Sequence, residues 1–239
     1  MNNVRTVSDT KRAFYSMHTR PINSIYRRVV EELMVEMHLL SVNVDFRYDP
    51  FYALGVVTSY ERFMQGYRPE QDKTSIFESL CRANEGDPGH YRHDAERLAE
   101  FTKNLSAEEL ISWLSLETPR GDDQGLGESL QAIANHSQFK YSRLFAIGLF
   151  TLVEQANPDL VKDEAQRTAT FEKVVAALHL PADKLQKDLE LYRSNLEKLT
   201  QARIVMEDIL KADRKKREER EQAQKASETS SDSQASTSA

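Results

Sequence analysis

The stretch that follows Pro181 constrains this chain most, because 45 consecutive residues, 182–226, contain neither glycine nor proline. Apolar side chains recur there at alternating spacings of four and three, which is the heptad pattern of a coiled-coil seam. The seam positions are Leu185, Leu189, Tyr192, Leu196, Leu199, Arg203, Met206 and Leu210. One of them, Arg203, is polar, and 22 of the 45 residues are charged, 12 basic and 10 acidic. The pattern predicts one long, charged helix with coiled-coil character.

Glycine and proline are scarce in the rest of the chain as well. The 8 glycines and 7 prolines among 239 residues are about half of the usual share. Sandwiches and barrels need these residues in their many turns, and nucleotide-binding folds need clustered glycines beside a strand. The chain is therefore predicted to be all-α, with its charged residues, 29% of the total, covering the surface.

Four of the prolines mark expected helix starts. Pro21, Pro50, Pro88 and Pro181 each precede a run with helical periodicity, and a proline in the first turn costs no hydrogen bond. The helices expected before Pro181 cover residues 8–18, 22–43, 50–64, 71–83, 88–102, 106–113, 127–135, 140–155 and 159–178.

Capping residues support several of these starts. Ser8 or Asp9 is expected to cap the first helix, and Asp87 the helix over residues 88–102. Ser106 and Glu109 have the spacing of a capping box, in which hydroxyl and carboxylate each accept a backbone N–H.

These patterns divide the chain into three parts. Residues 1–180 are expected to form a multi-helix globular body. Its most apolar run, Leu144–Val153, is too short to span a bilayer and is expected to be a core helix. Residues 181–226 are the long charged helix. Residues 227–239, of which eight are serine or threonine, are expected to be a disordered tail.

Charge and cysteine content exclude several classes of protein. The net charge of −6 argues against a general nucleic-acid binder, which needs a basic surface. The single cysteine, Cys81, excludes an internal disulfide framework and a cysteine-rich metal site. Residues 1–12 hold no apolar core of a secretory signal, so none is expected.

His90 and His93 form the most enzyme-like cluster. Histidines three apart share a helix face and could ligate a metal, with Asp87 or Asp94 as a carboxylate ligand. The sequence near them offers no further ligand motif, so a polar helix start is the favoured interpretation. A small His-ligated metalloenzyme stays the least favoured alternative, and we expect no catalytic residue, cofactor or metal.

Cys81 is expected to be a packing residue. It lies on the apolar side of a predicted helix together with Ile76, Phe77 and Leu80. A catalytic thiol needs an activating base and some exposure, and the sequence shows neither.

Arginines alternate with aromatic residues in the first third of the chain, a combination typical of protein-binding hot spots. A second basic stretch, Lys211–Arg220, has six basic and three acidic residues. It could contact anionic lipid headgroups, but a solvated helix with internal ion pairs is favoured. The candidate partner-binding residues are Arg12, Arg20, Arg28, Tyr48, Arg62, Tyr67, Arg214, Lys215 and Arg217.

Several long blocks resemble a known family. The blocks are Thr6–Phe14, His18–Tyr26, Val29–Leu39, Phe46–Gly55, Gly66–Pro69 and Ile76–Cys81. They are similar to the thylakoid formation family, also described as photosystem II biogenesis proteins. They cover about the first 95 residues closely, and the helical remainder with its charged C-terminal coiled coil also fits the family.

The resemblance implies a non-enzymatic, all-helical protein of oxygenic phototrophs at the thylakoid surface. It implies roles in photosynthetic membrane biogenesis and in photosystem II assembly and repair. It also implies association with the FtsH-type membrane protease that removes damaged reaction-centre protein. Plant members carry a transit peptide, and because the family blocks begin at Thr6, a cyanobacterial member on the cytoplasmic face of the thylakoid is expected. The family supplies no catalytic residues to carry over.

Sequence and resemblance together favour an accessory protein that binds and stabilises the FtsH-type protease complex. Photosystem II assembly and repair components are further expected partners, and nucleic acid is not. The main alternative is a lipid-binding structural coiled-coil protein that shapes thylakoid membranes.

Overall fold

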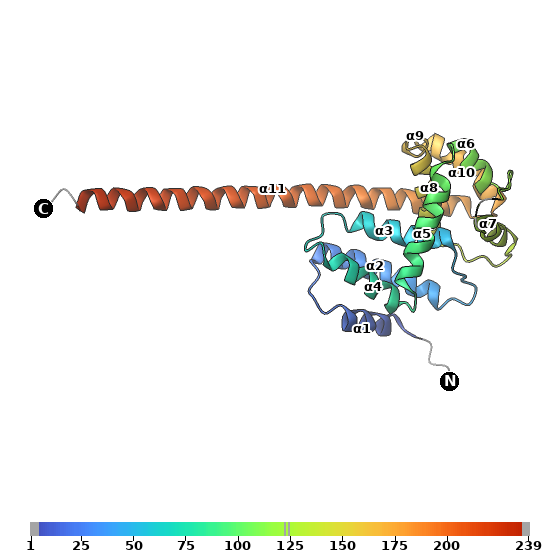
Figure 1. Cartoon of the computed structure of the whole chain (residues 1–239), viewed down its shortest axis with the longest axis horizontal. Helices are drawn as coiled ribbons and strands as arrows, with labels where there is room; N and C mark the ends of the chain where they lie inside the picture. The colour runs from blue at the N-terminus through green and yellow to red at the C-terminus, as the bar shows by residue number, and fades with distance from the viewer. Residues whose placement is uncertain (1–4, 122, 124, 236–239) are drawn as a thin grey trace. The chain divides into compact units, whose positions relative to one another are not determined.

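The computed structural model describes residues 5–121, 123 and 125–235, with side chains as far as residue 219 except those of Leu210 and Arg217. All regular elements in this part of the chain are helices, as the sequence predicts (Figure 1). They are α1 (Val7–Met17), α2 (Ser24–Ser41), α3 (Pro50–Phe63), α4 (Asp72–Ala83), α5 (Pro88–Lys103), α6 (Ala107–Leu114), α7 (Leu126–Asn135), α8 (Arg143–Ala156), α9 (Asp159–Lys162), α10 (Glu164–Ala177) and α11 (Ala182–Ala235).

The chain forms two compact units, Met1–Arg193 and Ser194–Ala239. The first unit holds α1–α10 and the first turns of α11, and the second holds the remainder of α11. The helical backbone of α11 continues to Ala235, into the segment 227–239 for which the sequence predicts disorder. Residues 236–239 lie outside the described part, and disorder of the tail stays a prediction.

The helix starts follow the capping chemistry. Asp87 accepts a hydrogen bond from the backbone N–H of His90, and Ser106 and Glu109 form the expected capping box. The first helix is capped differently from the prediction. Thr6 is its N-cap, and Asp9 is the third helical residue, which completes a capping box with Thr6. The prediction of Ser8 or Asp9 as the cap is therefore wrong by two or three residues.

Three predicted helices change their bounds for local reasons. The helix expected over residues 22–43 covers only Ser24–Ser41, because Asn23 is its N-cap and Val42 its C-cap. The single helix expected over residues 159–178 is split into α9 and α10, because Asp163 adopts an extended conformation and caps α10 through the N–H of Gln166. The helix expected from residue 140 begins only at Arg143, because Ser142 is its extended N-cap. The segment 140–142 is therefore free to line a surface groove.

α3 and α8 cross at the centre of the first unit. The whole run Leu144–Val153 of α8 is buried, which confirms the predicted core helix. Two glycines allow the backbones to touch: a Cβ added to Gly55 would lie 1.7 Å from the carbonyl oxygen of Leu144, and one added to Gly148 would lie 2.0 Å from that of Phe51. No other residue type fits at either position without moving a helix.

The first turns of α11 belong to the core of the first unit. Leu185, Leu189 and Tyr192 are at most 2% exposed. The Tyr192 ring lies 5.7 Å from that of Phe63 in α3 and 6.2 Å from that of Phe150 in α8. The first three seam positions are thus filled by the protein's own helices, and pairing of the later ones with another helix stays a prediction.

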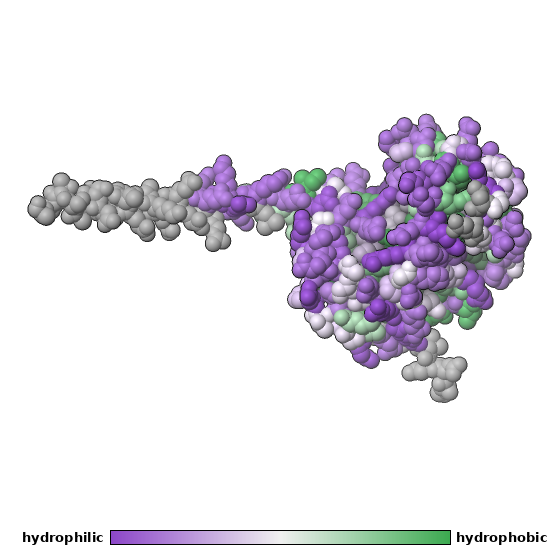
Figure 2. All heavy atoms as spheres, viewed as in Figure 1, coloured by the Kyte–Doolittle hydropathy of each residue, from purple (hydrophilic) through white to green (hydrophobic). Residues whose placement is uncertain are grey.

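The face of the first unit seen in Figure 2 is mostly hydrophilic, with scattered hydrophobic patches. No helix in the described parts of the chain combines the length and apolar character that crossing a bilayer requires.

Candidate functional site

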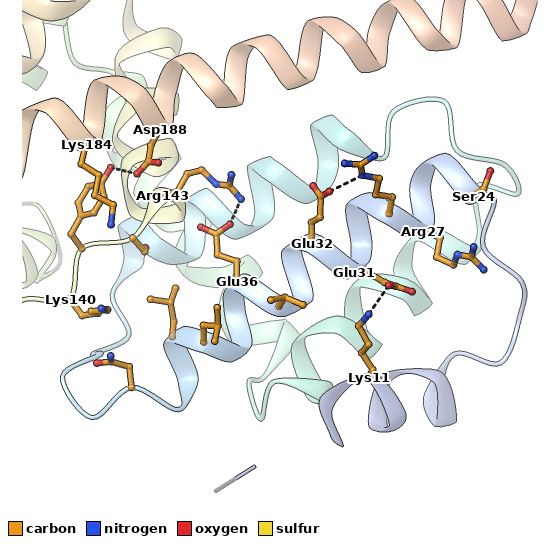
Figure 3. Close-up of a pocket in the computed structure, with 17 residues that line it drawn as sticks. Lys11, Ser24, Arg27, Glu31, Glu32, Glu36, Lys140, Arg143, Lys184 and Asp188 are labelled. Carbon is orange, nitrogen blue, oxygen red and sulfur yellow. Dashed lines mark hydrogen bonds and ion pairs between the residues drawn. The ribbon is translucent and has the colours of Figure 1, made fainter. Parts of the chain in front are cut away.

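A groove of about 930 Å³ runs along the outer face of α2 and is shown in Figure 3. We call it the α2 groove. It is bounded by α2, by Lys11 of α1, by the segment 140–142, by Arg143 at the start of α8 and by Lys184 and Asp188 of α11. All of these residues belong to the first compact unit.

The helical period of α2 produces this face. Leu33, Met34 and Met37 point into the core, and residues three and four positions away from each other share the opposite side. That side carries Arg28, Glu32, Val35 and Leu39, among others. Its N-terminal half is charged, and its C-terminal half carries Val35 and Leu39 beside the single carboxylate of Glu36.

Three groove carboxylates are paired with cations of the same surface. The Lys11 ammonium lies 2.8 Å from Glu31, and the Arg28 guanidinium lies 2.9 Å from Glu32. The Arg143 guanidinium pairs with Glu36. A fourth carboxylate, Asp188, accepts a hydrogen bond from the Tyr141 hydroxyl at 2.9 Å. The four carboxylates of the groove therefore all interact with side chains of the protein itself.

Burial and pairing set the proton affinity of these carboxyls. Hydrogen bonds from Lys11 and Tyr15 lower the pKa of Glu31. Burial raises the pKa of Glu36, although the paired Arg143 acts in the opposite direction. Glu36 thus depends on its arginine to stay ionised in a partly dry position.

Three cations of the groove form no ion pair with a carboxylate of the described residues, although Arg27 is close enough to Glu31 to contribute to the lowered pKa of that carboxyl. They are Arg27 and Lys140, which are exposed, and Lys184, whose ammonium lies 5.1 Å from the centre of the Tyr141 ring. Figure 3 shows Arg27 near one end of the groove and Lys140 and Lys184 near the other. The lining has six basic and four acidic residues, whereas the whole chain has a net charge of −6. The groove is therefore a locally basic surface on an acidic protein.

An apolar edge lies at the C-terminal end of α2. Leu39 lines the groove and is 58% exposed, Val42 is 37% exposed, and Val44 is 82% exposed. Isolated exposed aliphatic residues are ordinary, but three within six positions beside a groove make a candidate contact surface.

The predicted partner-binding arginines Arg12 of α1, Arg20 of the α1–α2 connection and Arg28 of α2 are exposed, and each has an acidic neighbour. Arg12 pairs with Asp9 of its own helix, and Arg20 pairs with the buried Asp72 of α4. Of the three, only Arg28 lines the α2 groove. Binding of a partner by any of them stays a prediction.

The other candidates of the first unit are tied into the body. The Tyr48 hydroxyl donates to Asp94, and the Arg62 guanidinium pairs with Glu154 of α8. Tyr67 is 1% exposed, where a partner cannot reach it in this conformation.

The last three candidates lie on α11. Arg214 pairs with Glu218 at 2.9 Å, and Lys215 lies 4.0 Å from Glu219, so both form ion pairs within the helix. The side chain of Arg217 lies outside the described residues.

Of the two histidines at the start of α5, His90 contacts a neighbouring carboxylate and His93 is exposed. The His90 Nε2 atom lies 3.0 Å from the Asp94 carboxylate, which also accepts from Tyr48. Asp87 is used as the cap of α5. Among the described residues no three histidine, cysteine or acidic side chains are grouped so as to hold a metal ion.

Cys81 is buried, as predicted, and burial raises the pKa of its thiol to about 12.

Sequence reasoning missed most of the groove. Its apolar members Val35 and Leu39 fall outside the core-facing repeat of α2, and this is the signal that could have found them. Lys140 and Lys184 are separated from α2 by about a hundred residues or more in the sequence, so only the fold brings them together.

Comparison with known proteins identifies the relatives of this chain. The model of the family described as "Thylakoid formation protein" matches residues 6–221. Protein Thf1 of Nostoc punctiforme is 66% identical over 218 residues, which cover 91% of this chain and 93% of the relative. Protein Thf1 of Gloeothece citriformis is 58% identical over 221 residues, covering 91% and 97%.

A solved structure supports the same conclusion. The structure described as "Structure of Psb29 at 1.55A" superposes with a TM-score of 0.77 and 43% sequence identity, over 89% of this chain and 98% of that one. The chain therefore belongs to the thylakoid formation protein family.

Proposed function

We propose that this chain is a non-enzymatic, thylakoid-associated accessory protein that binds and stabilises an FtsH-type membrane protease complex. Through that protease it serves the assembly and repair of photosystem II. It acts peripherally, on the cytoplasmic face of the thylakoid membrane.

Family membership carries this proposal. The family is named for thylakoid formation rather than for a reaction, and its match covers residues 6–221. A role in thylakoid biogenesis follows from the family, and the protease and photosystem II are the more specific step that we propose.

The chemistry of the described residues is consistent with a binding protein. The most strongly shifted groups among the described residues are tyrosines, the buried thiol of Cys81 and the buried cap Asp49, and desolvation is the first cause of each shift. By contrast, the α2 groove is open and lined by charged and apolar side chains, which suits contact with another protein.

Binding alone is sufficient for a stabilising role. A partner that binds only the assembled protease complex shifts its assembly equilibrium by mass action, without any chemical step. The accessory protein then determines how much of the complex accumulates.

Affinity purification tests the proposal. The tagged full-length chain is expressed in a cyanobacterium, thylakoid membranes are solubilised in mild detergent, and the retained proteins are quantified against an unrelated protein with the same tag. FtsH-type protease subunits are expected to be enriched with the tagged chain. Equal recovery from both samples would contradict the proposed partner.

A further inference from the structure

The α2 groove differs from the rest of the protein in charge. The chain is acidic overall, but the groove has two more basic than acidic lining residues. Its carboxylates Glu31, Glu32 and Glu36 are neutralised by cations of the same surface. Unpaired positive charge therefore remains to recognise a partner, and a complementary partner is acidic.

The distribution along the groove is more specific than its net charge. Arg27 lies near one end, Lys140 and Lys184 lie near the other, and Val35 and the 58% exposed Leu39 also line the groove (Figure 3). A fitting partner segment has carboxylates toward both ends and an apolar stripe that can reach these two side chains.

The shape of the groove also indicates which secondary structure the bound partner segment has. Its walls are helices and a short extended segment, and the described residues offer no sheet edge to which an extended peptide could add as a strand. In an amphipathic helix, apolar residues recur every three or four positions. Such a helix lying beside α2 can place these residues against Val35 and Leu39. From Ser24 to Leu40 the groove follows about 17 residues of α2, which corresponds to about 24 Å at a rise of about 1.5 Å per residue.

A protein segment fits better than a lipid surface. The charged pairs Lys11–Glu31 and Arg28–Glu32 share the groove with the unpaired cations. The flat surface of an anionic membrane would not fill a hollow of about 930 Å³. A helix can place its own polar residues against each pair.

From these observations, the geometry points to the α2 groove as the binding site for an acidic amphipathic helix of about four turns, contributed by a subunit of the membrane complex. The apolar face of that helix packs on Val35 and Leu39, and its carboxylates pair with Arg27 at one end and with Lys140 and Lys184 at the other. This inference deepens the proposed function, since it assumes a membrane-complex partner, but it does not require that the partner be the protease.

Photo-crosslinking from the groove tests the inference. A benzoylphenylalanine is introduced at Leu39 of the full-length chain, the protein is illuminated with native thylakoid membranes, and the crosslinked peptides are sequenced. The same experiment is done with the double variant Arg27→Glu/Lys140→Glu. The matched control is Arg82→Glu/Lys103→Glu, which reverses two exposed cations outside the groove and so changes the net charge equally.

The expected result is one crosslinked segment that is acidic and has apolar residues three and four apart. Its yield falls about tenfold or more in the groove variant and stays near the wild-type value in the control. A synthetic peptide of that segment then binds the purified chain in fluorescence anisotropy, with the same loss in the groove variant. Circular dichroism checks that all variants are folded. Folding is expected because Arg27 and Lys140 form no ion pair with a described residue, and because the pairs of Arg82 with Glu78 and of Lys103 with Glu100 are surface pairs within one helix, which contribute little to stability.

Other outcomes overturn the inference. These are crosslinks to lipid, to a second copy of this chain or to a basic segment, and yields that the groove variant leaves unchanged. If no acidic segment is crosslinked from the groove but the wild-type chain still retains the protease, the groove inference fails and the proposed function stands. If the groove captures an acidic helix but the wild-type chain retains no protease, the inference stands and the proposed partner is wrong.

Discussion

The crossing of α3 and α8 gives the sharpest test of the fold, through the substitution Gly55→Ala. The added Cβ would lie 1.7 Å from the carbonyl oxygen of Leu144, whereas ordinary contact begins at 3.4 Å. The added methyl group is fixed to the backbone of α3, and the oxygen belongs to the backbone of α8, so rotation of a side chain cannot relieve the contact. The two helices must move apart by about 1.5 Å or more, and the buried residues packed between them lose contact.

Two opposing effects determine how much Gly55→Ala lowers the free energy of unfolding. Overpacking a core by one methyl group costs about 1–3 kcal/mol, and a rigid backbone contact belongs at the upper end of that range. Alanine recovers up to about 1 kcal/mol of helix propensity. The free energy of unfolding should therefore fall by about 2–3 kcal/mol, which lowers the melting temperature by about 4–12 °C for a domain of this size.

Urea denaturation followed by circular dichroism measures the change. Gly121→Ala is the matched control, since nothing lies within 4 Å of its added Cβ, and it should be neutral or slightly stabilising. If Gly55→Ala were as stable as Gly121→Ala, the close packing of α3 on α8 would be wrong.

Three further predictions concern buried groups. Burial lowers the pKa of His38. The stability that the neutral histidine contributes is therefore present above pH 6.5 and is lost as the pH falls below 6.5. The urea concentration at the midpoint of unfolding should decline from pH 8 to pH 5, and it should decline less steeply in His38→Gln. Cys81 should react with a thiol reagent at pH 8 only after unfolding, because burial raises its pKa to about 12; rapid labelling of the native protein would contradict this. Arg143→Met should lower the free energy of unfolding by about 1–3 kcal/mol, because it leaves the half-buried Glu36 unpaired. Arg28→Met removes an exposed pair and should lower it by at most about 0.5 kcal/mol. Equal losses of unfolding free energy in urea denaturation would refute this reasoning.

Most of the fold could be predicted from the sequence because its signals are local. The first-turn prolines Pro50 and Pro88 begin α3 and α5 where the sequence places them. The continuous apolar run Leu144–Val153 predicts a core helix by its length, and the whole run is buried in α8. The split at Asp163 could not be predicted, because an aspartate is compatible with both a helix interior and a cap.

The candidate site was largely hidden for a different reason. The sequence identifies Arg28 as a candidate, but two other cations of the groove, Lys140 and Lys184, lie more than a hundred residues after it in the chain. Tyr67 is a different case. Its residue type is typical of a binding hot spot, but the fold buries it in the core. Composition identifies residue types suited to binding, but only the tertiary fold decides which of them are exposed together.

The lifetime of the FtsH-type protease tests the central claim most directly. Protein synthesis is blocked in a cyanobacterial strain that lacks this chain and in the same strain expressing it, and the amount of protease in thylakoid membranes is followed over time. A stabilising partner predicts that the protease disappears faster without the chain and that the full-length chain restores its lifetime. Equal lifetimes in the two strains would contradict the account.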